Sequence, residues 1–193
     1  RSKFGPVVSH VRIGARQEDI HSVRVAAGDA DLLLGCDLVV SAAEDPLAKL
    51  HDERSHAVVN DFEAPTAAFT RDPDVVFPTE AMKAKIREEV GDEKTTFVDA
   101  TSIATALLGD AIAANLFLLG FAFQRGLVPV GEEAISRAIE LNGVQVRFNQ
   151  QAFLWGRRAA HDEAAVRAVA GLGSGAPDPA PSLDALIAQR AAF

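Results

Sequence analysis

The stretch Ala111–Phe123, AIAANLFLLGFAF, is apolar on almost every side of the helix that it predicts. A helix without a polar face has to be covered on two sides. One side can pack on a β-sheet, and the other needs further helices or a partner subunit. Asp110 and Gln124 bound this stretch, so the uninterrupted apolar pieces are shorter than the roughly 18 residues that a membrane span needs. We therefore expect a buried helix and no membrane partner.

Short apolar strands alternate with helices before this stretch, and helices follow it. Helices are predicted from Asp45-Pro46, from about Glu80 to Val90 with Thr79 as N-cap and Gly91 as its end, and over most of the chain from Ser102 to Val169. Asp29 is expected to cap a short helical turn. The predicted strands are DLVVS (37–41), HAVVN (56–60) and TTFVD (95–99). This alternation predicts an α/β protein: a three-layer α/β/α Rossmann-like domain with a mostly parallel sheet and a helical C-terminal part.

The N-terminal region predicts two further strands, Pro6–Ile13 and His21–Ala26, paired antiparallel. Ser9 and His10 then point to opposite faces and cannot form a nucleophile–base pair. His10 and Arg12 share a face. They could together meet an anionic ligand or a carboxylate, or simply form a solvated or interface-facing polar surface.

Three predicted strands end in small polar residues: Ser41, Asn60 and Asp99. In an open parallel sheet, ligands bind beyond the carboxyl ends of the strands, so these side chains are candidate ligand-binding residues at one rim. The alternative is helix capping and turn chemistry, for which Ser, Asn and Asp are common residues.

Polar residues in the helical part allow similar pairs of interpretations. Asp110 is most simply an N-cap, whereas Asn115 needs a hydrogen-bond partner if it is buried, which makes it a further candidate for structural bonding or ligand contact. His161, Asp162 and Glu163 have the composition of a metal site. We do not expect one, because these residues are consecutive at a helix start and their side chains diverge. A basic, aromatic corner is formed by Trp155, Arg157 and Arg158. We favour an interface contact there over phosphate binding.

Composition narrows the class of protein further. The chain has 193 residues, 48% of them hydrophobic, which suits one domain. The net charge is −8 and no basic stripe runs along a predicted element, so we expect no nucleic-acid partner. One cysteine cannot form an internal disulfide or hold an iron–sulfur cluster, and it suits a reducing compartment such as the cytoplasm. Residues 1–20 carry no secretory signal.

Longer runs resemble one enzyme family. They are SHVRIG (9–14), GDADLLLGCDLVVSAAED (28–45), ATALLGDAIAANLFLLGFAFQRGLVPV (104–130) and EEAISRAIELNGVQVRFNQQAFLWGRRAA (132–160). Together they resemble the gamma-type domain of 2-oxoacid:ferredoxin oxidoreductases, the pyruvate/ketoisovalerate oxidoreductase catalytic domain. The nearest resemblance is to the fused bacterial indolepyruvate ferredoxin oxidoreductases, and its most specific part is AIELNGVQVRFNQQAFLWGRR (138–158).

The resemblance implies an oxidative decarboxylation of an aryl 2-oxoacid to its acyl-CoA, with electrons passed to ferredoxin. Thiamine diphosphate, iron–sulfur clusters and CoA serve the complete enzyme. It also implies that other domains hold thiamine and the clusters, so we expect no cofactor bound by this chain and no activity of the chain alone. The implied partners are the thiamine-binding and ferredoxin-type domains of the same enzyme, and ferredoxin through those domains.

The chain also departs from this family. The gamma-type domain normally opens with a strand and a glycine-rich turn before SHVRI, and that first βα unit is missing here. We therefore expect a fragment, with a gamma-type domain over residues 1–170 and a flexible linker with a short C-terminal helix over 171–193. The missing unit leaves a sheet edge uncovered, which favours a homodimer.

Overall fold

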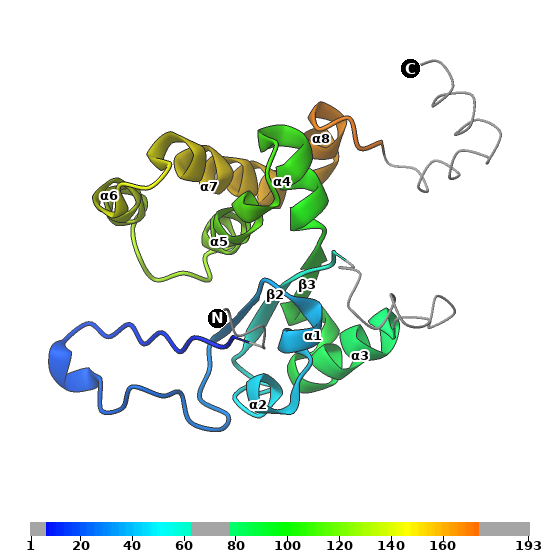
Figure 1. Ribbon diagram of the computed structural model, residues 1–193. Helices are drawn as coiled ribbons and strands as arrows, with labels where there is room; N and C mark the ends of the chain where they lie inside the picture. Colours follow the sequence, from blue (N-terminus) through cyan, green and yellow to red (C-terminus); the bar gives the residue numbers. More distant parts are fainter. Residues whose placement is uncertain (1–6, 63–77, 174–193) are drawn as a thin grey trace, which may run out of the picture.

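The computed structural model describes residues 7–62 and 78–173, which form a parallel sheet with helices on both faces (Figure 1). The strands are β1 (Leu32–Gly35), β2 (His56–Asn60) and β3 (Thr95–Val98). The α-helices are α1 (Leu38–Ser41), α2 (Glu44–Leu47), α3 (Thr79–Val90), α4 (Ala100–Leu108), α5 (Ala114–Gln124), α6 (Glu132–Asn142), α7 (Val146–His161) and α8 (Glu163–Val169). Three short 3-10 helices are η1 (Gln17–Asp19), η2 (Asp92–Lys94) and η3 (Ala111–Ala113).

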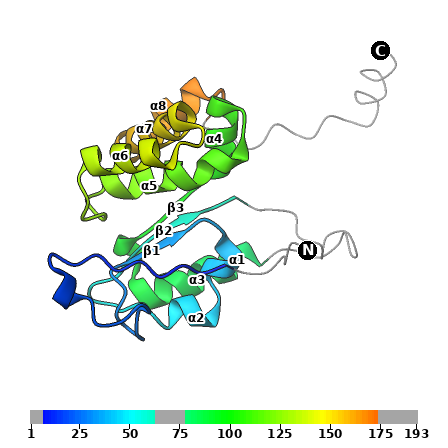
Figure 2. The same ribbon diagram turned by 60° about the vertical axis from the view of Figure 1, so that its left-hand side comes forward.

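The sheet has the order β1-β2-β3, and both strand pairs are parallel. The central strand β2 is buried on both faces, which explains its continuous apolar run. Its side chains alternate between two cores: Val58 packs with the helices α4, α5 and α7, whereas Ala57 and Val59 pack with α1 to α3. Figure 2 shows the resulting three layers, with α1, α2 and α3 below the sheet and α4 to α8 above it. The predicted α/β class with a helical C-terminal part is confirmed.

The apolar stretch that opened the sequence analysis is covered on two sides, as its composition requires. It divides into η3 and α5, and α5 packs on β1 and β2 with one side and against α7 with another. Phe117 and Leu118 of α5 are fully buried. Glycines allow the close approach of the two helices: a Cβ on Gly120 would lie 2.0 Å from the carbonyl oxygen of Phe153, and a Cβ on Gly156 would lie 1.8 Å from that of Phe117.

The first strand of the sheet is not where the sequence placed it. The prediction of a strand over Asp37–Ser41 is wrong, because the strand is Leu32–Gly35 and Leu38–Ser41 is the helix α1. Asp37 is the N-cap of α1, and its side chain accepts a hydrogen bond from the Val40 amide. Two short apolar runs lie side by side in this region, and periodicity alone cannot tell a short buried strand from a helical turn. Asp29 does not cap a helix either; its carboxylate forms ion pairs with Arg12 and Arg54.

The antiparallel strand pair at the N-terminus is also absent from the part of the chain that the structure describes. Residues 7–26, here called the N-terminal arm, contain only η1 as a regular element. The arm is the dark-blue segment that extends to the left of the sheet in Figure 1. Its two legs are joined by hydrogen bonds from or to side chains: the Val25 amide donates to His10 Nδ1, and Arg12 donates to the Arg24 carbonyl. The side chains of His10 and Arg12 thus bind backbone groups of residues 24 and 25, where a strand pair would have backbone-to-backbone hydrogen bonds.

The remaining helices lie near their predicted positions. Gly91, with a φ of 92°, ends α3, but the N-cap position belongs to Pro78, and Thr79 is the first helical residue. None of the described helices is long and apolar enough to cross a membrane. The linker and C-terminal helix predicted for residues 171–193 lie outside the described residues from residue 174 onward.

Candidate functional site

The carboxyl ends of the three parallel strands meet at one edge of the sheet, and Asn60 is the polar residue at its centre. Its side chain is 5% exposed and makes four hydrogen bonds. Nδ2 donates to the Cys36 carbonyl at 3.2 Å and to Thr101 Oγ1 at 2.8 Å. Oδ1 accepts from the amides of Ala100 at 3.1 Å and Thr101 at 3.4 Å. Asn60 thus joins the end of β1 to the first turn of α4.

Asp99 and Ser41 lie at the same edge and are also engaged within the chain. Asp99 follows β3 and caps α4, since its Oδ1 accepts from the Ser102 amide at 2.9 Å. Ser41 belongs to α1 and is 3% exposed; its hydroxyl donates to the Asp37 carbonyl at 2.6 Å. It packs on the end of β1, where a Cβ on Gly35 would lie 2.2 Å from Ser41 Oγ. The structure therefore brings the three rim candidates to one edge, with hydrogen bonds of the helix-capping and turn type.

Two further groups at this edge were not identified from the sequence. Cys36 follows β1 and is exposed as a residue, but neighbouring atoms partly shield its thiol from water; this partial desolvation raises the pKa of the thiol, and the Asp37 carboxylate adds to the effect. That direction keeps the thiol protonated, which disfavours nucleophilic chemistry. Asp61 follows Asn60 and pairs with Lys83 of α3 at 2.6 Å, while Glu80 lies 3.3 Å from the same Nζ.

Lys83 is the most enclosed cation of this edge, with a side chain 13% exposed. Burial acts to lower its pKa, but the hydrogen bonds and charges of Asp61 and Glu80 outweigh that effect and raise the pKa above the ordinary lysine value. Its ammonium group also lies 5.5 Å from the centre of the Phe97 ring on β3. Lys83 therefore remains charged and ties α3 to the ends of β2 and β3.

His10 and Arg12 lie apart from this edge, beside residues that precede β1. Arg12 meets a carboxylate: its Nη2 lies 2.8 Å from Asp29 Oδ2, and Arg54 Nη2 lies 2.9 Å from Asp29 Oδ1. The hydrogen bond from Arg54 lowers the pKa of Asp29, burial opposes that effect, and the charge of Arg12 reinforces it. The sequence left two roles for His10 and Arg12: contact with an anion or a carboxylate, or a solvated or interface-facing polar surface. Arg12 makes the carboxylate contact, with Asp29.

The polar candidates of the helical part do not converge on a cavity. Asp110 caps η3 by accepting from the Ile112 amide, and Asn115 is exposed on α5. Asp162 caps α8. No three His, Cys, Asp or Glu side chains within residues 7–62 and 78–173 lie close enough to hold a metal ion.

The basic, aromatic corner makes contacts within the helical layer. Arg158 lies over the Trp155 ring at 4.7 Å. Arg157 joins three helices, because it donates to Gln124 of α5 at 3.0 Å and pairs with Glu132 of α6 at 2.5 Å.

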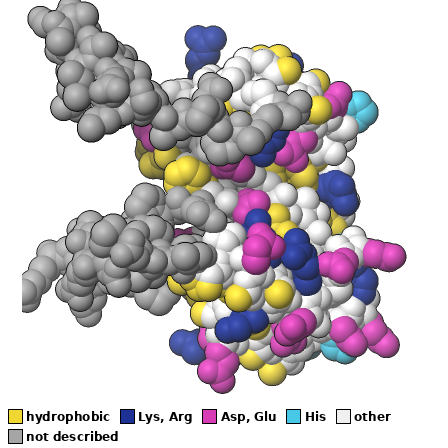
Figure 3. Space-filling view, turned by 90° about the vertical axis from the view of Figure 1, so that its right-hand side faces the viewer, with side chains coloured by type: hydrophobic (Ala, Val, Ile, Leu, Met, Phe, Trp, Pro, Cys, Tyr) yellow, Lys and Arg dark blue, Asp and Glu magenta, His cyan; other side chains and the backbone are white. Residues whose placement is uncertain are grey.

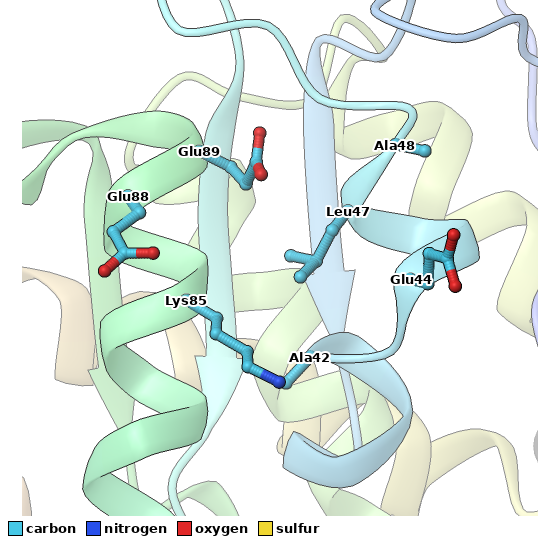
Figure 4. A pocket seen from close by; sticks show the side chains of 7 residues that line it. All are labelled: Ala42, Glu44, Leu47, Ala48, Lys85, Glu88 and Glu89. Carbon is cyan, nitrogen blue, oxygen red and sulfur yellow. The ribbon is translucent and has the colours of Figure 1, made fainter.

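Two surface hollows of the described part lie away from the edge around Asn60. One hollow of about 350 Å³ lies between the α1–α2 segment and α3, where Glu44, Glu88, Glu89 and Lys85 surround Leu47 (Figure 4). Another, of about 620 Å³, lies at the start of α6 beside Glu132 and Glu133. On the face shown in Figure 3, acidic and basic side chains are interspersed and form no stripe of one sign. Neither hollow is lined by a residue that the sequence singled out.

Local sequence signals could have found part of what was missed. Gly35, Cys36 and Asp37 follow the apolar run Leu32–Leu34, and an apolar run bounded by such residues is the usual pattern of a strand that ends in a turn. Asp61 directly follows Asn60. No local signal pairs Asp61 with Lys83 or Asn60 with Thr101, because those partners are far apart in the sequence.

The fold and this edge define a parallel α/β domain in which the carboxyl ends of the strands are closed by internal hydrogen bonds. The chain matches the family model described as pyruvate ferredoxin/flavodoxin oxidoreductase over residues 1–159, and it belongs to that family. It is therefore a domain of a 2-oxoacid:ferredoxin/flavodoxin oxidoreductase, a class of multi-domain or multi-subunit enzymes that use thiamine diphosphate and iron–sulfur clusters. Neither a curated protein nor a solved structure matches the chain.

Proposed function

We propose that this chain is the gamma-type domain of an indolepyruvate-type 2-oxoacid:ferredoxin oxidoreductase and that it is inactive alone. The complete enzyme would convert an aryl 2-oxoacid, CoA and oxidised ferredoxin to the acyl-CoA, carbon dioxide and reduced ferredoxin. The observation that carries the proposal is the family match over residues 1–159. The indolepyruvate specificity rests on the resemblance of residues 138–158 to that branch of the family.

The donor set of the chain does not fit an iron–sulfur cluster. Such a cluster takes four thiolates as a rule, and the chain has one cysteine, whose pKa is raised. We therefore derive no electron-transfer step through this chain and assign the clusters to partner domains. Thiamine diphosphate, when bound by its own domain, supplies the carbanion stabilisation that decarboxylation requires.

The role we assign to this chain is to provide a rigid wall for its partners. The buried side-chain polar atoms of the described residues all have hydrogen-bond partners, and the edge around Asn60 is closed by its own contacts. A surface of this kind can position neighbouring domains without reorganising. Its proposed partners are the thiamine-binding and ferredoxin-type domains, with ferredoxin reached through those domains, and a second copy of the chain in a cytoplasmic enzyme.

A reconstitution experiment tests the proposal. The chain is mixed with the thiamine-binding and cluster-binding polypeptides of an indolepyruvate-type enzyme that lacks its own gamma-type domain, and CoA-dependent reduction of ferredoxin is followed. We expect reduction with indolepyruvate only when all components are present, and less with pyruvate or ketoisovalerate. Full turnover by the isolated chain would contradict the proposal, and so would a mixture that the chain does not activate. A preference for pyruvate would overturn the indolepyruvate assignment alone.

A second candidate is a stand-alone domain that binds an anionic small molecule or serves only in assembly. The observation that favours binding is that Ser41, Asn60 and Asp99 share one edge of the sheet. A thermal-shift series with CoA and with nucleotides separates the candidates, because saturating ligand raises the free energy of unfolding by a few kcal/mol. A shift that Asn115→Ala retains and Asp99→Ala removes would favour the rim as a ligand site.

A further inference from the structure

The chain has four asparagines, and one of them is followed by a glycine. They are Asn60, Asn115, Asn142 and Asn149, and Gly143 follows Asn142. Asparagine is a heat-labile residue, because the backbone nitrogen of the next residue can attack its side-chain carbonyl carbon. Glycine hinders this attack least, since it has no Cβ. The sequence therefore singles out position 142 among the four.

The structure protects the other three asparagines. Asn60 is 5% exposed and its side chain is held by hydrogen bonds to Cys36, Ala100 and Thr101. Asn149 lies inside α7, and its Nδ2 donates to the Val144 carbonyl at 2.9 Å. Asn115 is exposed, but it lies in α5 and is followed by a leucine, whose side chain shields the next backbone nitrogen.

Asn142 has none of this protection. It is the last residue of α6, and residues 141–145 are all exposed. Among the described residues, none forms a hydrogen bond with its side chain. A Cβ built on Gly143 would have no atom within 4 Å, so the backbone at this position is open to solvent. Both the carbon that would be attacked and the attacking nitrogen are thus accessible.

The helical conformation does not align the two atoms for attack, so the last turn of α6 has to open first. The Gly143 amide is held by one hydrogen bond, to the Glu140 carbonyl at 3.1 Å. Ends of helices open locally at low cost. The turn also holds Gln145 at a φ of 46°, and no other non-glycine residue of the described part has a positive φ. Opening of the turn releases the free energy that this conformation costs.

We propose that Asn142 and Gly143 form a site of spontaneous covalent modification, at which the chain deamidates with time. The Gly143 nitrogen bonds to Cγ of Asn142 and loses its proton, the bond from Cγ to Nδ2 breaks, and ammonia leaves. The product is a succinimide ring. Water then opens the ring at either carbonyl carbon and yields aspartate or isoaspartate at position 142. One carboxylate is gained, so the net charge changes from −8 to −9.

The modification should loosen α6 from α7. The new carboxylate lies at the carboxyl end of α6, where the helix dipole disfavours negative charge. Isoaspartate also adds one methylene group to the main chain between the two helices. Ile135 and Ile139 hold α6 against Phe153 of α7, and a changed connection strains this contact.

The test follows the purified full chain during incubation in warm, mildly alkaline buffer. Isoelectric focusing should show a new band that is more acidic by one charge. Trypsin cleaves after Arg137, Arg147 and Arg157, so Asn142 and Asn149 fall in different peptides, and mass mapping assigns the site. We expect conversion in the peptide 138–147 and labelling of that peptide by an isoaspartyl methyltransferase.

Asn142→Gln is the test variant, because its longer side chain disfavours ring closure, and it should lose the new band. Asn115→Gln is the matched control and should keep it. A chain that stays unmodified at Asn142, or that converts Asn115 or Asn149 to the same extent, would overturn the site.

Thermal unfolding then tests the effect on α6. Modified chain, purified by anion exchange, should unfold about 2–4 °C lower than fresh chain, the shift typical of a small loss of stability in a chain of this length. Asn142→Asp, which has the charge without the added methylene, should fall between them. An unchanged midpoint after complete conversion would overturn the loosening of α6. None of these measurements uses ferredoxin reduction, so their failure is distinct from failure of the proposed function.

Discussion

Gly156 of α7 lies directly against Phe117 of α5, so close that a Cβ at position 156 would come to 1.8 Å from the Phe117 carbonyl oxygen. Gly120 of α5 makes the reciprocal approach to Phe153 of α7. No side chain fits between the two backbones, and this close crossing holds the helical layer that covers the sheet.

Gly156→Ala should therefore destabilise the chain by about 1–3 kcal/mol or more, because the added methyl group forces α5 and α7 apart. Urea denaturation followed by circular dichroism measures the effect. Gly173→Ala is the control, since a Cβ there has no atom within 4 Å. Equal stability of the two variants would show that the helices can separate without loss of packing.

Asn60→Ala should lower the free energy of unfolding by about 1–3 kcal/mol, because the Ala100 amide and the Cys36 carbonyl lose a buried partner. Asn149→Ala, which removes one exposed hydrogen bond to the Val144 carbonyl, should have a much smaller effect. Chemical denaturation of both variants is the measurement. An Asn60→Ala chain as stable as the natural one would contradict the role of Asn60 in closing the edge.

The contact between the arm and the body should weaken in acid. The pKa of Asp29 is lowered in the folded chain, so its contribution is fully present above the ordinary value of 3.8 and is lost as the pH falls through the native pKa. Hydrogen exchange of the Arg12 guanidinium protons, which bind Asp29 and the Arg24 carbonyl, should report release of the arm below that range.

Asp29→Asn should release the arm even at neutral pH, whereas Asp45→Asn should not, because Asp45 pairs with Lys49 on the surface and, among the described residues, with no group of the arm. An Asp29 carboxyl that titrates at or above 3.8 in the folded chain, measured by NMR, would contradict the ion-pair account.

Lys83 should give the opposite dependence on pH. Its pKa is raised in the folded chain, so its contribution is present below the ordinary value of 10.5 and is lost as the pH rises through the native pKa. Lys83→Met should destabilise the chain at neutral pH and reduce its loss of stability above that range. Lys85→Met on the same helix is the control, and thermal unfolding from neutral to alkaline pH is the measurement. Identical stability profiles for the two variants would contradict the role of Lys83 in joining α3 to the ends of β2 and β3.

Several features of this protein follow from the sequence because their causes are local. The strand β2 contains a short apolar run and ends in Asn60, and β3 is a run of β-branched and aromatic residues that is followed by Asp99. Asp99, Asp110 and Asp162 cap helices through amides two or three residues away. The apolar character of the segment that contains α5 required cover on two sides, and the sheet and α7 supply it.

Tertiary structure decided the rest, because the deciding contacts join residues far apart in the chain. Leu32–Gly35 is the first strand since it pairs with β2, and Leu38–Ser41 is helical although its residues are as apolar. The arm lacks a ladder because His10 and Arg12 bind the backbone of its other leg. Asn60 became the centre of the edge through Cys36 and Thr101, which are 24 and 41 residues away. Apolar period and capping chemistry act within a few residues, whereas strand pairing and buried side-chain hydrogen bonds depend on which distant segments the fold brings together.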